Sequence, residues 1–116
     1  MGRHDRIAMA IISAVLPTVA LVSSATSASP VRAAHSYTVV IDKMKFGAVP
    51  NGLRVGDTVM WVNRDLFRHT ATAADHSFDI DLAAGKIGKT IMKNAGLAAF
   101  SCKYHPGMKG RLVVAK

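Results

Sequence analysis

The sequence is poor in cysteine and in acidic residues. Among 116 residues it has one cysteine, Cys102, and 7 Asp plus Glu against 15 Lys plus Arg. A single cysteine excludes a disulfide within the chain, so a small domain needs another source of stability. No segment after residue 35 shows a convincing helical period, which argues against an α-helical domain. The length leaves room for one small domain.

The first third of the chain has the layout of a secretory signal. Basic residues come first, residues 7–22 are uncharged and mostly apolar, and the Ser/Ala-rich segment SSATSAS follows. This order predicts a signal peptide and short linker over residues 1–34, cut somewhere between 28 and 34. The alternative is an uncleaved anchor, but the apolar run is shorter than the roughly 20 residues of a spanning helix and contains Pro17. We therefore expect a periplasmic or otherwise exported protein with no membrane span in its mature form.

The chain is basic, with a formal net charge of +8. Its cationic residues are scattered and no nucleic-acid-binding motif occurs, so we expect no nucleic acid partner. A solvated basic surface, or docking to an acidic protein or membrane face, fits better. The scattered cations are Lys43, Lys45, Arg54, Arg64, Lys86, Lys89, Lys93 and Lys109.

Residues 35–116 have the pattern of an all-β domain. Short runs rich in β-branched residues alternate with Gly, Pro, Asn and Asp, which predicts seven or eight strands packed as a β-sandwich. Residues 71–84 are ambiguous and are compatible with a strand, a loop and one helical turn. The predicted strands are residues 36–42, 55–63, 69–73, 77–80, 87–93, 97–102 and 110–115.

Three residues that can bind a soft metal lie close together near the C-terminus. Cys102, His105 and Met108 follow one another at Cys-x-x-His-x-x-Met spacing. Such a short loop can turn all three side chains toward one point. His69 is the best candidate for a fourth ligand, since it follows the strand 55–63 and would lie at the same end of a sandwich.

This set of ligands favours copper. Two imidazoles, one thiolate and a weak thioether suit a metal that alternates between Cu(I) and Cu(II). Zinc would also accept His, His and Cys, but a thioether adds nothing to a zinc site. Taken alone, Cys102 could equally be an inert buried thiol or part of an intermolecular disulfide.

Residues 44–115 resemble the cupredoxins, the small blue copper proteins. The resemblance rests on MKF followed by VP, on VGDTVMWVNRD with a following His, on the hairpin entering FSC, on His105-Pro106 with Met108 beyond, and on KGRLVV. It implies an eight-stranded Greek-key β-sandwich with one type 1 copper ion held by His69, Cys102, His105 and Met108. Several positions depart from the family: among them, Thr70 replaces a common Asn, and Lys103-Tyr104 replaces a common Thr-Pro.

The resemblance also implies a function. It predicts a monomeric one-electron carrier, not an enzyme, with transient redox partners such as a periplasmic dehydrogenase and a cytochrome c. We expect the edge of the His105 ring to be the electron port, inside an apolar collar of Phe67, Pro106, Gly107 and Met108. Three alternatives remain: a copper-delivery protein, an enzyme with Cys102 as nucleophile and His69 or His105 as base, and an adhesion module without metal.

Overall fold

The computed structural model describes residues 10–116, which form two compact units. One unit ends at Pro30 and the other is Val31–Lys116. Residues 10–35 contain no helix or strand, and no helix among the described residues is long and apolar enough to cross a membrane. The basic start of the predicted leader, with Arg3, His4 and Arg6, lies outside the described residues.

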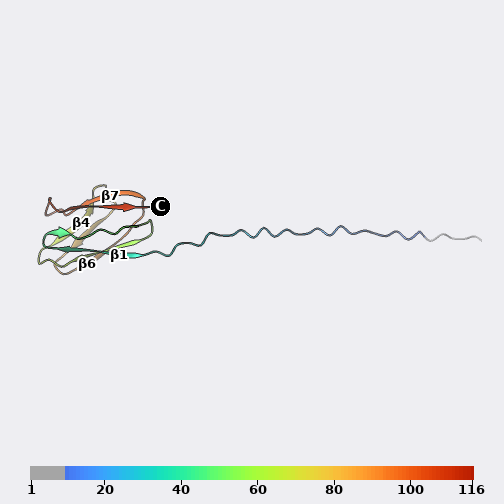
Figure 1. Ribbon diagram of the computed structural model, residues 1–116, viewed down its shortest axis with the longest axis horizontal. Coiled ribbons are helices and arrows are strands. Elements are labelled where there is room, and N and C mark those ends of the chain that lie inside the picture. Colours follow the sequence, from blue (N-terminus) through green and yellow to red (C-terminus); the bar gives the residue numbers. More distant parts are fainter. Residues whose placement is uncertain (1–9) are drawn as a thin grey trace, which may run out of the picture. The chain divides into compact units, whose positions relative to one another are not determined.

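The second unit is a sandwich of two four-stranded sheets, which confirms the predicted fold class. One sheet has the order β2-β1-β3-β6 and the other β5-β4-β7-β8; Figure 1 shows β1 and β6 in one layer and β4 and β7 in the other. Within the first sheet β1 runs parallel to β3. The strands are β1 Ser36–Asp42, β2 Lys45–Phe46, β3 Thr58–Asn63, β4 His69–Ala73, β5 Asp79–Leu82, β6 Ile87–Ile91, β7 Gly96–Ser101 and β8 Lys109–Val114.

Apart from three differences that bear on the fold, the predicted strands match the observed ones to within one or two residues at their ends. The strand predicted from residue 55 begins at Thr58, because Gly56 has a φ of +93° and the Asp57 amide bonds Arg54 O at 3.0 Å, which makes residues 54–57 a turn. The strand predicted at 77–80 lies at Asp79–Leu82. The two-residue strand β2 was not predicted at all.

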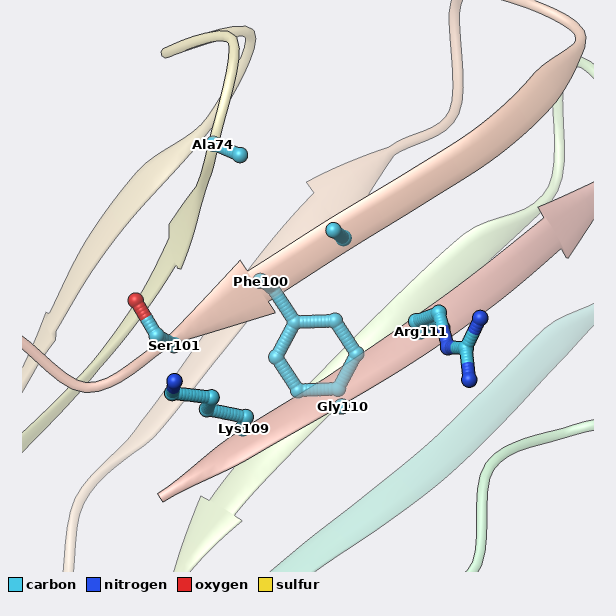
Figure 2. Close-up of a pocket in the computed structure, with 7 residues that line it drawn as sticks. Ala74, Phe100, Ser101, Lys109, Gly110 and Arg111 are labelled. Carbon is cyan, nitrogen blue, oxygen red and sulfur yellow. The ribbon is translucent and has the colours of Figure 1, made fainter. Parts of the chain in front are cut away.

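An aromatic cluster fills the space between the sheets. Trp61 is fully buried, and its indole N–H donates to Thr90 Oγ1 at 3.0 Å. Phe46 and Phe100 present their rings to Trp61 edge-on, with centroids 6.0 and 5.0 Å away. Figure 2 shows the Phe100 ring against Gly110 of β8, where an added Cβ would come within 2.3 Å of the ring. Close packing against this glycine fixes β7 and β8 relative to the core.

A buried carboxylate stabilises the end of the domain where the chain enters β1. The Asp57 side chain is fully buried and accepts hydrogen bonds from the Arg32 guanidinium at 2.9 and 3.2 Å, and from the backbone amides of His35 and Arg54 at 2.9 and 2.8 Å. The Arg32 hydrogen bonds, followed by that of His35, hold the pKa of Asp57 far below its ordinary range, although burial opposes them.

This arrangement predicts acid sensitivity. Because the Asp57 pKa is lower in the folded than in the unfolded chain, its stabilising contribution is complete above the unfolded pKa of about 4 and is lost as the pH falls below it. We expect Asp57→Asn to lower the free energy of unfolding at pH 7 and to flatten its decrease between about pH 4 and pH 2. Urea unfolding of the metal-free protein, in a form that retains Arg32, measures both effects at several pH values. Asp42→Asn, at the exposed end of β1, is the matched control; parallel pH profiles for wild type and Asp57→Asn would contradict the prediction.

Candidate metal centre

The antiparallel pairing of β4 with β7 brings two distant loops to one end of the sandwich. His69 is the first residue of β4, and Cys102 follows the last residue of β7. Thr72 pairs with Ser101, so the start of β4 and the end of β7 lie at the same end of the sheet. The topology thus places His69 beside the loop that carries Cys102 and His105, as the sequence predicted.

Three donor atoms converge at this end. His69 Nδ1 and His105 Nδ1 are 3.2 Å apart, and Cys102 Sγ lies 3.8 Å from the first and 3.6 Å from the second. These residues are the group in the described chain whose His, Cys or carboxylate atoms could jointly hold a metal ion. His69 and Cys102 are buried, with 0% and 2% exposed surface, while His105 is half-buried.

The triangle fits a metal ion. A point about 2 Å from both nitrogens, a normal metal–imidazole distance, also lies about 2 Å from the sulfur in the plane of the three atoms. Nearly trigonal binding by two imidazoles and one thiolate is typical of type 1 copper sites. The same burial argues against an intermolecular disulfide, because a thiol with 2% exposure cannot meet a second chain without opening the loop.

Asp65 fixes the orientation of the His69 ring. His69 Nε2 lies 2.7 Å from Asp65 Oδ2, so the proton sits on Nε2 and Nδ1 keeps its lone pair for a metal. The same carboxylate accepts the backbone amides of Lys43 and Met44 at 2.7 and 2.9 Å. Burial would raise the pKa of Asp65, but the Met44 amide and the His69 hydrogen bond outweigh it, and the pKa is lowered. Asp65 was not among the site residues predicted from the sequence.

The loop before His69 is held from inside the sandwich by Asn63. This buried residue, the last of β3, donates from Nδ2 to Phe67 O at 2.7 Å and to Leu82 O at 3.0 Å. Its Oδ1 accepts the Asp65 amide at 2.9 Å. These bonds fix the backbone of residues 64–68, so Asp65 and His69 are held in place independently of any ligand.

The C-terminal loop is short and closed by its own backbone. Cys102 N–H donates to Met108 O at 3.1 Å, and Met108 N–H donates to His105 O at 2.8 Å. The Cys102 sulfur accepts the Thr70 amide at 3.3 Å. Met108 is buried, with 5% exposure. Of the predicted apolar collar, Phe67, Pro106 and Gly107 are exposed, whereas the Met108 side chain is packed in the core.

Among the described histidines, His35 and His76 lie outside this group of potential metal ligands. His35 and His76 are exposed, and His76 occupies a turn with a φ of +60°. Met92 is a core residue with 5% exposure. The pocket in Figure 2, on the outer face of β7 and β8, is lined by Ala74, Ser101, Lys109 and their neighbours and contains none of the candidate ligands.

Comparison with known proteins agrees with the site. No family model matches the chain. Amicyanin from Paracoccus denitrificans is 30% identical over 129 residues, covering 93% of this chain and 92% of that protein. The Cu(I) form of a methionine-to-alanine variant of amicyanin matches with a TM-score of 0.59 and 27% identity, over 72% of this chain and 85% of that one. The reduced Cu(I) form of a proline-to-glycine variant of amicyanin at pH 4 matches with a TM-score of 0.58 and 28% identity. This match covers 68% of this chain and 81% of that one.

The eight-stranded sandwich and the His–Cys–His triangle define a copper protein with a type 1 site pattern. This confirms the copper cofactor predicted from the sequence. The chain belongs to the cupredoxin family of copper-binding electron carriers, and within that family its similarity is to amicyanin. That relationship agrees with the short Cys-x-x-His-x-x-Met spacing.

Proposed function

We propose that the protein is a periplasmic one-electron carrier in which His69, Cys102 and His105 would hold a copper ion, with Met108 as a weaker fourth ligand. The observation that carries this proposal is the triangle of donor atoms, 3.2 to 3.8 Å apart, formed where two loops meet. Copper bound there supplies reversible one-electron chemistry between Cu(I) and Cu(II).

The protein residues hold the ligand atoms in one arrangement. Asp65 keeps the proton of His69 on Nε2, and the Thr70 amide donates to the Cys102 sulfur. Asn63 fixes the loop between β3 and β4. A site preorganised in this way has little to rearrange when the charge of its metal changes, which favours fast electron transfer.

The exposed side of His105 is the proposed electron port. His105 is half-buried, whereas Leu66, Phe67 and Tyr104 on the same two loops are 91%, 59% and 54% exposed. An exposed apolar contact surrounded by a basic domain suits short-lived docking to acidic redox proteins. A periplasmic dehydrogenase as donor and a cytochrome c as acceptor fit this chemistry, with the carrier acting as a monomer and not as an enzyme.

Export and processing are part of the proposal. We propose that residues 1–34 act as a signal peptide and linker and that residues 35–116 form the copper domain. The contact between Arg32 and Asp57 bears on the cut site, because cleavage after Ala28 would retain this ion pair and cleavage after Ala33 would remove it. Mass spectrometry of protein secreted to the periplasm distinguishes these products.

The competing copper-delivery function fits the burial less well. A delivery protein must present its ligands to a recipient, and here two of the three triangle residues, His69 and Cys102, have 2% exposure or less. Because the Cys102 sulfur and the His69 ring are buried, the site suits a metal that stays bound while electrons move in and out.

Copper addition tests the proposed function. One equivalent of Cu(II) should produce an intense absorption at about 600 nm that ascorbate bleaches and a mild oxidant restores. His76→Ala, which removes an exposed histidine outside the triangle, is the matched control and should behave as wild type. A colourless copper complex, or a blue complex that cannot be cycled between oxidation states, would contradict electron carriage.

A further inference from the structure

Four residues beside the triangle form a closed ring of polar contacts, in which Lys103 takes part with both its backbone amide and its ammonium group. The Lys103 amide donates to Thr70 Oγ1 at 2.9 Å, and Thr70 Oγ1 lies 2.9 Å from Thr72 Oγ1. Thr72 Oγ1 donates to Asp79 Oδ1 at 2.9 Å, and Asp79 Oδ2 pairs with the Lys103 ammonium. We call these four residues the Thr70–Lys103 ring. It joins the ligand loop to β4 and β5.

The protons in this ring have one consistent order. An ionised Asp79 only accepts, so the Thr72 hydroxyl must donate to it. Thr72 Oγ1 then accepts from the Thr70 hydroxyl, which leaves Thr70 Oγ1 as the acceptor of the Lys103 amide. Each hydroxyl both donates and accepts, and such chains are cooperative because each bond polarises the next.

The ring touches the residues next to two proposed ligands. Thr70 follows His69, and its amide donates to the Cys102 sulfur; Lys103 follows Cys102. Thr70 and Thr72 are buried, with 2% and 7% exposure. The ring therefore links both ligand loops through the face of β4 that carries Thr70 and Thr72.

We propose that Thr72 and Asp79 are positioning residues of the copper centre, acting through Thr70 to fix the amide–sulfur hydrogen bond at Cys102. This inference rests on the proposed copper site. A hydrogen bond to the ligand sulfur withdraws electron density from it and is one of the features that set the potential of such a site. Loosening the ring should therefore lower the reduction potential, because a more electron-rich sulfur favours Cu(II).

The hydrogen bonds through the Thr70 and Thr72 hydroxyls carry this role, and the ion pair does not. The Lys103 and Asp79 side chains are 50% and 44% exposed, and exposed ion pairs of this kind contribute little. Lys103→Gln removes the ammonium but keeps the backbone amide, so it should leave the centre nearly unchanged. Asp79→Asn keeps an oxygen that can accept from Thr72 and should behave similarly.

Thr72→Val is the main test, because it removes a hydroxyl without changing charge or size much. In the metal-free protein, amide hydrogen exchange at Lys103 should become about five- to tenfold faster. This increase corresponds to the net free energy that one hydrogen bond contributes to local stability. In the copper-loaded protein, the reduction potential should fall and the position of the visible band should shift. Thr72→Ser should restore both properties.

Asp79→Ala is the second test and Asp81→Ala is its matched control. Both remove one carboxylate from the outer face of β5, but Asp81 pairs with Arg68 at 3.4 Å and does not reach Thr72. Asp79→Ala should speed exchange at Lys103, and Asp81→Ala should not. If Asp81→Ala shifts the potential as much as Asp79→Ala, the effect is that of surface charge alone and the proposal is overturned.

The two readouts separate this inference from the proposed function. Unchanged exchange at Lys103 in Thr72→Val would overturn the ring as a positioning device even if the protein is blue. Faster exchange with an unchanged potential and spectrum would show a ring that supports the fold without tuning the centre, which also overturns the proposal. A wild-type protein that never turns blue would instead contradict the proposed function itself.

Discussion

Cys102→Ser is expected to abolish the intense visible absorption of the copper-loaded protein. The band requires a thiolate bound to Cu(II), and a serine hydroxyl neither ionises nor donates in this way near neutral pH. His69 and His105 remain, so the variant should still bind Cu(II), but more weakly and without colour. Electron self-exchange, measured by NMR line broadening in mixtures of both oxidation states, should fall to a level too slow to detect.

The matched control removes a different buried sulfur. Met92 has 5% exposure and belongs to the core, and its backbone bonds the Asp57 turn instead of the ligand loops. Met92→Leu should keep the full absorption. Retention of the band in Cys102→Ser would show that its sulfur is not a ligand, and loss of the band in Met92→Leu would show that the band reports general packing.

Asp65→Ala is expected to weaken copper binding by about 10- to 100-fold, the usual cost of removing a carboxylate that orients a metal-binding histidine. Without this acceptor, His69 can rotate, and its proton is no longer confined to Nε2. Asp65→Asn keeps one acceptor oxygen and should recover part of the affinity. Competition with a chelator of known affinity measures the change.

Asp42→Ala separates this effect from damage to the neighbouring turn. Asp42 Oδ1 accepts the Lys43 amide at 2.9 Å, as Asp65 does at 2.7 Å, but only Asp65 also reaches His69. Asp42→Ala should therefore leave copper affinity unchanged. Equal losses in Asp42→Ala and Asp65→Ala would assign the effect to the turn between β1 and β2, and no loss in Asp65→Ala would contradict the orienting role.

The part of the site that could be predicted from sequence is the part formed by a short loop. Cys102, His105 and Met108 lie within seven residues, and chain geometry alone keeps them together. His69 was predictable because the alternation of β3 and the sandwich topology place its loop at the same end. Both predictions depend on local spacing or on the order of strands, which the residue pattern reveals.

The residues that support the site could not be predicted in the same way. Thr72, Asp79 and Lys103 meet only because Thr72 pairs with Asp79 across β4 and β5, and the segment that contains β5 was ambiguous. The predicted strand there was displaced because Ser77 belongs to a turn, with its amide bonded to Asp75 Oδ1 at 2.9 Å. Moving a strand by two residues along the sequence leaves each side chain on the same face of the sheet, but it gives each residue a different cross-strand partner.

The triangle residues all come from one layer of the sandwich, since His69 begins β4 while Cys102 and His105 lie between β7 and β8. Asp65 connects the two sheets, because its carboxylate binds both His69 of β4 and the backbone of the turn after β1. A shift of one sheet relative to the other would therefore change the orientation of the His69 ring. The visible absorption of the copper-loaded protein would then report how the two sheets are aligned, without any added label.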